Sequence, residues 1–139
     1  MFVQIVIVTF MLLEFLNVLA LYFAPGSKYA NAVGVFTAWE QSKRHPELHA
    51  FVLYLVNWVA GVKLIFLALL AVIVLFADAE VQRLSLVALA LTTASFYWRL
   101  FPLIRRMARQ GEIEPSNYAT LLGVMILAFI AAFVAAAIF

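Results

Sequence analysis

Four long apolar stretches, separated by short polar segments, dominate the hydrophobic pattern of this chain. They cover about residues 2–23, 46–76, 81–103 and 118–139. Each stretch is continuously apolar rather than alternating, which indicates helices and not the strands of a membrane barrel. About 20 apolar helical residues cross the roughly 30 Å hydrocarbon core of a bilayer. We therefore predict an all-α integral membrane protein, with residues 1–139 forming one left-handed, up-and-down bundle of four transmembrane helices.

The segment between the first two stretches, about residues 28–45, has a mixed pattern. Tyr29, Phe36 and Trp39 fall near one helical face, and charged residues follow them. This pattern predicts an amphipathic interfacial helix that could serve as a docking surface. The alternative is a structured loop packed on the bundle.

Composition supports a membrane location. Hydrophobic residues make up 68% of the 139 positions, whereas a soluble domain has about 45–50%. The chain contains no cysteine, which excludes a disulfide framework and thiolate metal sites. The first stretch lacks the positive start and the cleavage site of a signal peptide, so we expect it to be retained as a span.

The positions of Lys and Arg predict the orientation of the spans. They concentrate in the first and third connecting segments, at Lys28, Lys43, Arg44, Arg105, Arg106 and Arg109, whereas the second connection has only Arg83. The positive-inside rule then places loops 24–50 and 104–117 in the cytoplasm and both termini outside. We expect an integral membrane protein of the bacterial inner-membrane type.

The first two stretches each carry one deep charge. Glu14 lies twelve positions from Phe2, and Lys63 lies thirteen positions from Phe76. At about 1.5 Å per residue, both lie roughly 18–20 Å from the outer end of their helices. Consecutive antiparallel helices are usually neighbours, so we expect the two side chains to form an ion pair, with Asn17 one turn deeper. Such a pair either belongs to a proton or ion relay or polar ligand site, or only locks two helices together.

Other polar residues form weaker patterns. Ser85, Ala88, Thr92, Ser95 and Arg99 share one face of the third stretch, which predicts either close helix packing or a polar, ligand-binding stripe. Tyr54 and Asn57 share a face of the second stretch with Gly61 and are further ligand-binding candidates, although Lys63 points elsewhere. Ala128, Ala132 and Ala136 recur every fourth residue of the last stretch and predict a tight helix contact, within the bundle or in a homo-oligomer.

Candidate chemistry is sparse. His45 and His49 stand four residues apart and could share a metal, but the sequence nominates no third ligand. We expect two interfacial histidines and no metal site. No Ser/His/Asp set, phosphate-binding loop or nucleic-acid signal can be assembled, so we expect no enzyme, no cofactor and no nucleic-acid partner.

Three functions stay open. The first is a small oligomeric transporter or channel that uses the Glu14–Lys63 pair. The second is a non-catalytic accessory or assembly subunit of a larger membrane complex, in which the pair only holds helices together. The third is a protein that binds or processes lipid headgroups through Arg99 and the aromatic residues of the first loop.

Overall fold

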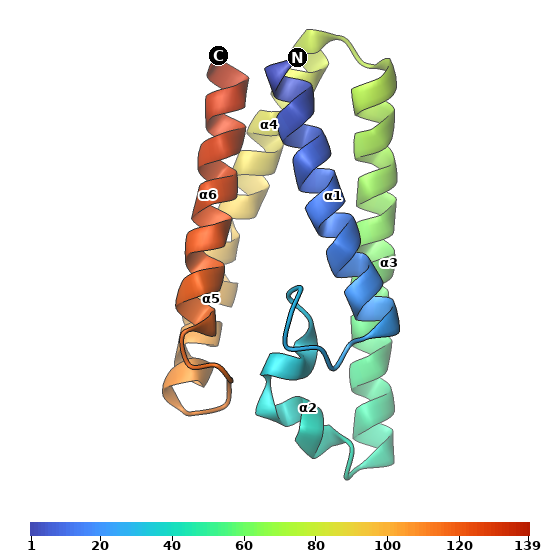
Figure 1. Ribbon diagram of the computed structural model, residues 1–139, viewed down its shortest axis with the longest axis vertical. Helices are drawn as coiled ribbons and strands as arrows, with labels where there is room; N and C mark the ends of the chain where they lie inside the picture. The colour runs from blue at the N-terminus through green and yellow to red at the C-terminus, as the bar shows by residue number, and fades with distance from the viewer.

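The computed structural model describes residues 1–139 as an all-α protein without β-strands (Figure 1). Its elements are α1 (Phe2–Phe23), the 3₁₀ turn η1 (Val33–Val35), α2 (Thr37–Ser42), α3 (Pro46–Phe76), α4 (Ala79–Ala94), α5 (Phe96–Arg109) and α6 (Tyr118–Ile138). The long helices run up and down, and both termini lie at one end together with the α3–α4 turn. We call the half of the bundle nearest the termini the terminal half, and the half that carries the first and third loops the loop half.

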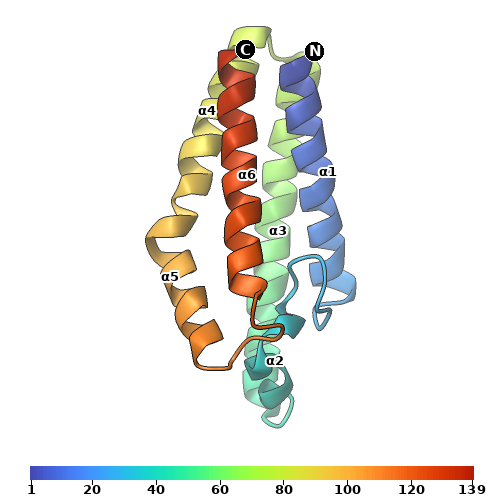
Figure 2. The ribbon, with the colours of Figure 1, turned by 60° about the vertical axis from the view of Figure 1, so that its left-hand side comes forward.

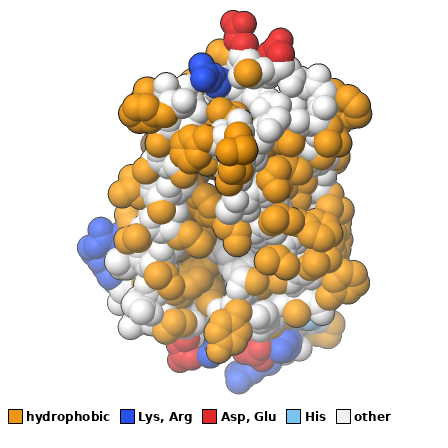
Figure 3. All heavy atoms as spheres, turned by 45° about the horizontal axis from the view of Figure 1, so that its top comes forward, with side chains coloured by type: hydrophobic (Ala, Val, Ile, Leu, Met, Phe, Trp, Pro, Cys, Tyr) orange, Lys and Arg blue, Asp and Glu red, His pale blue; other side chains and the backbone are white.

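Four helical segments are long and apolar enough to cross a membrane: Phe2–Phe23, Pro46–Phe76, Ala79–Arg109 and Tyr118–Ile138. Hydrophobic side chains cover the flanks of the molecule, and most charged side chains gather at its two ends (Figure 3). An apolar flank between charged ends matches a bilayer core between two aqueous phases. The predicted four-span helical membrane protein is thus confirmed.

The third span differs from the expected continuous helix over 81–103. It begins at the Asp78 cap, whose side chain accepts a hydrogen bond from the Val81 amide at 2.9 Å, and it ends beyond Leu103. It is interrupted at Ser95, and α5 turns away from the line of α4 (Figure 2). Pro102, about two turns further along, has no amide hydrogen for the carbonyl of Trp98, so the first part of α5 also lacks one helical hydrogen bond.

The expected interfacial helix is present but much shorter than residues 28–45. Only Thr37–Ser42 form α2, and Tyr29 lies in the irregular segment before it. Left-handed backbone at Ala30 and Asn31, each with φ of 55°, prevents a helix from running through them. The structure therefore contains part of each alternative, since a packed loop is followed by a short helix.

The terminal half has one core to which all four spans contribute. Ile7 and Phe10 of α1 meet Phe133 of α6, and their neighbours in this cluster are Leu70, Leu86, Leu89, Ala90 and Ala136. The rings of Phe10 and Phe133 meet edge to face with centroids 5.0 Å apart. The last residue of the alanine repeat, Ala136, is buried here where α6 packs along α4, whereas Ala128 is exposed.

The loop half has two separate cores instead of one. One lies between α1 and α3 and contains Val18, Leu21, Ala32, Val56, Ala60 and Leu67. The other joins α5 to α6 and contains Val35, Ile104, Ile113, Ala119 and Leu122. The two helix pairs separate toward this end, and the segment that follows α1 lies between them (Figure 1).

The first and third loops are joined at this end of the bundle. Phe36 and Ile113 form an isolated antiparallel bridge, with hydrogen bonds from the Thr37 amide to the Glu112 carbonyl at 2.9 Å and from the Glu114 amide to the Val35 carbonyl at 2.8 Å. Lys28 and Glu114 add an exposed ion pair at 3.2 Å. The two basic loops therefore lie together at one end; their assignment to the cytoplasm stays a prediction.

Candidate functional site

Lys63 and Glu14 form an ion pair between α3 and α1. The Lys63 Nζ donates to Glu14 Oε2 at 2.6 Å, and the two side chains are 25% and 23% exposed. The pair forms because the antiparallel helices α1 and α3 pack along each other and bring the two residues to the same depth. Both groups stay partly accessible, so the pair is not sealed in a dry core.

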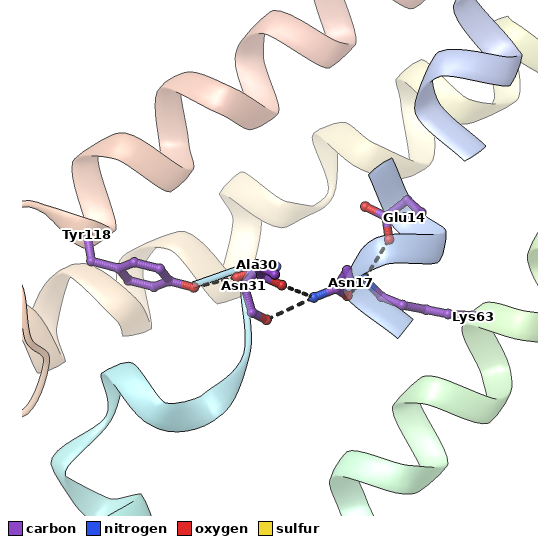
Figure 4. A network of polar contacts seen from close by, with 6 residues as sticks. All are labelled: Glu14, Asn17, Ala30, Asn31, Lys63 and Tyr118. Carbon is purple, nitrogen blue, oxygen red and sulfur yellow. Dashed lines mark hydrogen bonds and ion pairs between the residues drawn. The ribbon is translucent and has the colours of Figure 1, made fainter. Parts of the chain in front are cut away.

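Asn17 connects this pair to the first loop. Its Oδ1 accepts a second hydrogen bond from Lys63 Nζ at 2.6 Å, and its Nδ2 donates to the carbonyls of Ala30 and Asn31, the latter at 3.1 Å (Figure 4). The side chain is only 6% exposed, so its amide would be costly to bury without these partners. Asn17 thus holds two left-handed loop residues against the centre of the bundle.

Tyr118 extends the network to the last span. Its hydroxyl, at the start of α6, donates to Asn31 Oδ1 (Figure 4). A continuous chain of polar contacts therefore runs from α3 through α1 and the first loop to α6. Sequence reasoning missed Ala30, Asn31 and Tyr118. The only signal in the sequence was Asn31 itself. Asparagine is one of the few residues that tolerate left-handed backbone, so an asparagine in the first loop could have indicated a turn there.

The two ends of the loop pack closely against each other. Gly34 lies against the backbone of Gly26 and Ser27, so a Cβ at this position would overlap the Gly26 carbonyl and approach the Ser27 oxygen to 2.6 Å. The Gly34 amide also donates to the Ser27 carbonyl at 3.2 Å. Only glycine allows the two backbone strands of the loop to lie this close.

A cavity of about 580 Å³ lies between α1, α6 and this loop. Its polar wall contains Glu14, Asn17, Lys28, Tyr29, Asn31 and Tyr118, and its apolar wall contains Leu13, Leu16, Ala30, Pro115, Leu121, Leu122, Met125 and Phe129. This volume falls in the range of about 300–1,000 Å³ typical of small-molecule sites, and a mostly apolar lining with a few polar groups is also typical of them. The cavity exists because the helix pairs separate in the loop half and the loop fills only part of the gap.

Glu14 belongs to both the network and the cavity. Only its Oε2 is hydrogen-bonded within the chain, and its second oxygen, Oε1, receives no hydrogen bond. Figure 4 shows this second oxygen turned away from Lys63 to the side of Tyr118. A free acceptor on the wall of the cavity could therefore bind a donor group of a ligand.

The polar stripe of the third span does not join this site. The hydroxyls of Ser85, Thr92 and Ser95 donate to carbonyls of their own helix, at Val81, Ala88 and Thr92, over 2.8, 2.7 and 2.6 Å. Arg99 is exposed and lines only a shallow surface depression with Thr92 and Ser95. These hydroxyls are thus occupied locally, in the way that serine and threonine commonly satisfy themselves in helices.

The two polar candidates on α3 also lie apart from the cavity. Tyr54 is exposed beside Phe51 and Trp58, with ring centroids 6.4 and 6.2 Å away. Asn57 is exposed and makes no side-chain hydrogen bond within the chain. Neither residue lines the cavity. This agrees with the helical period, which places Tyr54 and Asn57 on a different face of α3 from Lys63.

The proposed docking residues separate into different environments. Tyr29 is 83% exposed, Phe36 is half-buried, and Trp39 is 6% exposed, so they share no common outer face. Trp39 is not available for docking because it packs against the ring of His49, with centroids 4.9 Å apart. Tyr29 instead lies on the cavity wall, where its hydroxyl could contact a ligand.

Of the two histidines, only His49 makes a side-chain hydrogen bond within the chain. His49 Nδ1 is 2.8 Å from the Ser42 hydroxyl, which joins α2 to α3. No group of three or more histidine, cysteine, aspartate or glutamate side chains is arranged to hold a metal ion. His49 is thus engaged by the Ser42 hydroxyl and the Trp39 ring, whereas His45 is exposed.

Comparisons with known proteins add no relationship. No protein-family model matches the chain, and no match was found among curated proteins or among solved structures. Inferences about its function therefore depend on the geometry described above.

Proposed function

We propose that this protein is a small membrane transporter whose substrate occupies the cavity between α1 and α6. The observation that carries the proposal is the position of Glu14, which pairs with Lys63 on one side and lines the cavity on the other. Ionisable groups inside a membrane are costly, and they commonly mark the path of a substrate or proton. The channel and oligomer alternatives remain predictions from the sequence.

The polar network suggests how occupancy could be coupled to movement. A substrate that draws Glu14 toward the cavity would weaken its contact with Lys63. Lys63 also bonds to Asn17, and Asn17 in turn holds Ala30 and Asn31 of the loop. Substrate binding would therefore alter the contacts that keep the loop between the two helix pairs. Alternating access requires such a two-state element at the binding site.

Cysteine accessibility tests this proposal without knowledge of the substrate. The chain has no native cysteine, so single replacements can be read directly. Met125→Cys places a thiol on the cavity wall, and Leu127→Cys places one on the same helix at an exposed position outside the cavity. Each variant is embedded in sealed vesicles of both orientations and treated with a membrane-impermeant maleimide.

A transporter should allow the reagent to reach position 125 from both sides of the membrane, because the cavity opens alternately to each. Position 127 should stay unlabelled in both orientations, since lipid covers it. Absence of labelling at position 125, or labelling from one side only, would contradict alternating access.

A second candidate function is a non-catalytic assembly subunit. The observation that favours it is that Lys63 already has two acceptors, Glu14 and Asn17. The network can therefore serve only to hold α1 and α3 together. In this case the protein would copurify with a stoichiometric partner, and position 125 would be unreachable from either side.

A further inference from the structure

The cavity wall offers unused hydrogen-bonding groups but no unpaired charge. Glu14 is neutralised by Lys63 at 2.6 Å, and Lys28 is neutralised by Glu114 at 3.2 Å. The remaining polar members of the lining are two asparagines and two tyrosines, which offer hydrogen bonds. An ionic head group of either sign would therefore leave water without a free counter-charge, which is unfavourable.

The free groups are both donors and acceptors. Glu14 Oε1 is a free acceptor, and the Asn31 Nδ2 makes no hydrogen bond although its Oδ1 is engaged by Tyr118. The Tyr29 hydroxyl also has no partner within the chain. A hydroxyl both donates and accepts hydrogen bonds and carries no charge, so it can satisfy such a mixed set.

The apolar wall defines the rest of the ligand. Leu121, Met125 and Phe129 are spaced four residues apart on α6 and form one strip, with Leu13 facing them from α1. Eight residues of helix correspond to a strip about 12 Å long. Such a strip next to a polar wall matches a single hydrocarbon chain that ends in a polar head.

We propose that the cavity binds a single-chain amphiphile with an uncharged, hydroxylated head group. The head contacts Glu14 Oε1 and Asn31, and the chain lies along the strip on α6. This inference names the substrate class for the proposed function and takes from it the cavity as the binding site.

The test compares three probes that share a twelve-carbon chain: monododecanoylglycerol, dodecanoate and dodecyltrimethylammonium. The full chain is held in phosphatidylcholine nanodiscs, and bound probe is counted by native mass spectrometry at equal probe concentrations. We expect a one-to-one complex with monododecanoylglycerol and at least about tenfold lower occupancy by either ionic probe, because each would lose hydration without gaining a free counter-charge. Equal or greater occupancy by an ionic probe would overturn the neutral-head assignment.

Two variants locate the bound molecule. Leu121→Trp fills the cavity from a wall position that is 64% exposed, and Leu127→Trp adds the same bulk at a position that is 59% exposed but outside the lining. We expect the first variant to lose most of the bound monododecanoylglycerol and the second to retain it. Full binding by the Leu121→Trp variant would overturn the proposed location. Retained helical circular dichroism in both variants shows that the comparison is between folded proteins.

The two proposals can fail separately. Binding of monododecanoylglycerol together with an unreachable cysteine at position 125 would refute transport and leave the ligand assignment intact. A cysteine that is reachable from both sides, combined with preferred binding of an ionic probe, would refute the ligand assignment alone.

Discussion

The terminal and loop halves of the bundle are made from the same four spans, but they are held together differently. In the terminal half, side chains from all four spans meet in one apolar core around Phe10 and Phe133. In the loop half, two apolar cores remain separate, and a loop, a polar network and a cavity occupy the space between them. The terminal half is therefore closed, whereas in the loop half the two helix pairs are bridged by the first loop and its hydrogen bonds.

This contrast is physically reasonable in a membrane. Lipid is as apolar as leucine, so helices associate there through close packing and polar contacts rather than through the hydrophobic effect. The terminal half is held together by close packing, with small residues such as Ala90 and Ala136 in its core. The loop half adds polar contacts between its two helix pairs, and such contacts can be exchanged for contacts with a ligand. A binding site is therefore expected in the half that carries the network.

The largest effect should come from the closed core. Phe133→Ala removes a side chain that is 0% exposed and makes edge-to-face contact with Phe10. We expect a loss of about 3 kcal/mol in the free energy of unfolding, because the truncation leaves a cavity. The measurement is reversible unfolding in mixed micelles followed by circular dichroism. The neighbouring, exposed Val134→Ala is the control, and an equal loss in both variants would contradict a packed terminal core.

A somewhat smaller effect is expected at the loop. Gly34→Ala places a methyl group against the backbone of Gly26 and Ser27, which cannot move aside as a flexible side chain would. We expect a loss of about 2 kcal/mol in the same unfolding assay, together with increased hydrogen exchange over residues 26–36. Gly61→Ala is the matched control, since its Cβ would meet only the Tyr22 hydroxyl at an ordinary 3.5 Å. An unchanged exchange rate in the Gly34 variant would show that the loop is not held in this way.

Removing the hub of the network should loosen the loop half selectively. Asn17→Ala eliminates the contacts with Lys63, Ala30 and Asn31. We expect a loss of about 1–3 kcal/mol and faster amide exchange in the loop, with little change in the terminal half. Asn57→Ala serves as control because Asn57 is exposed and makes no side-chain hydrogen bond. Faster exchange throughout the bundle would mean that the two halves do not behave as separate units.

The smallest effect is expected at the end of the network. Tyr118→Phe removes only the hydroxyl that donates to Asn31. We expect a loss of about 0.5–1.5 kcal/mol, the usual net contribution of one hydrogen bond. Tyr54→Phe, at an exposed tyrosine outside the network, should change the unfolding free energy by less. A larger loss for Tyr54→Phe than for Tyr118→Phe would contradict the role of Tyr118 in linking α6 to the loop.

The sequence predicted the spans and the deep ion pair but not the cavity. Continuous apolar runs and a helical rise of about 1.5 Å per residue are sufficient to place Glu14 and Lys63 at matching depth. The cavity depends instead on the separation of the helix pairs and on left-handed backbone at Ala30 and Asn31, which arise from tertiary packing. The break at Ser95 was missed because apolar periodicity continues through it. The common helical face expected for Tyr29, Phe36 and Trp39 is absent, because Tyr29 and Phe36 lie before the short helix α2.

The most direct test of the account is a double-mutant cycle on the ion pair. We expect Glu14→Gln and Lys63→Met each to lower the free energy of unfolding by about 1–3 kcal/mol, because the remaining partner is left uncompensated near the middle of the membrane. The combined replacement should recover a large part of this loss and give a coupling energy of at least about 1 kcal/mol. The exposed pair Glu40–Lys43, treated in the same way, should give a coupling energy of about 0.5 kcal/mol or less. Strictly additive losses at Glu14 and Lys63 would contradict the account, because the charges would then not depend on each other.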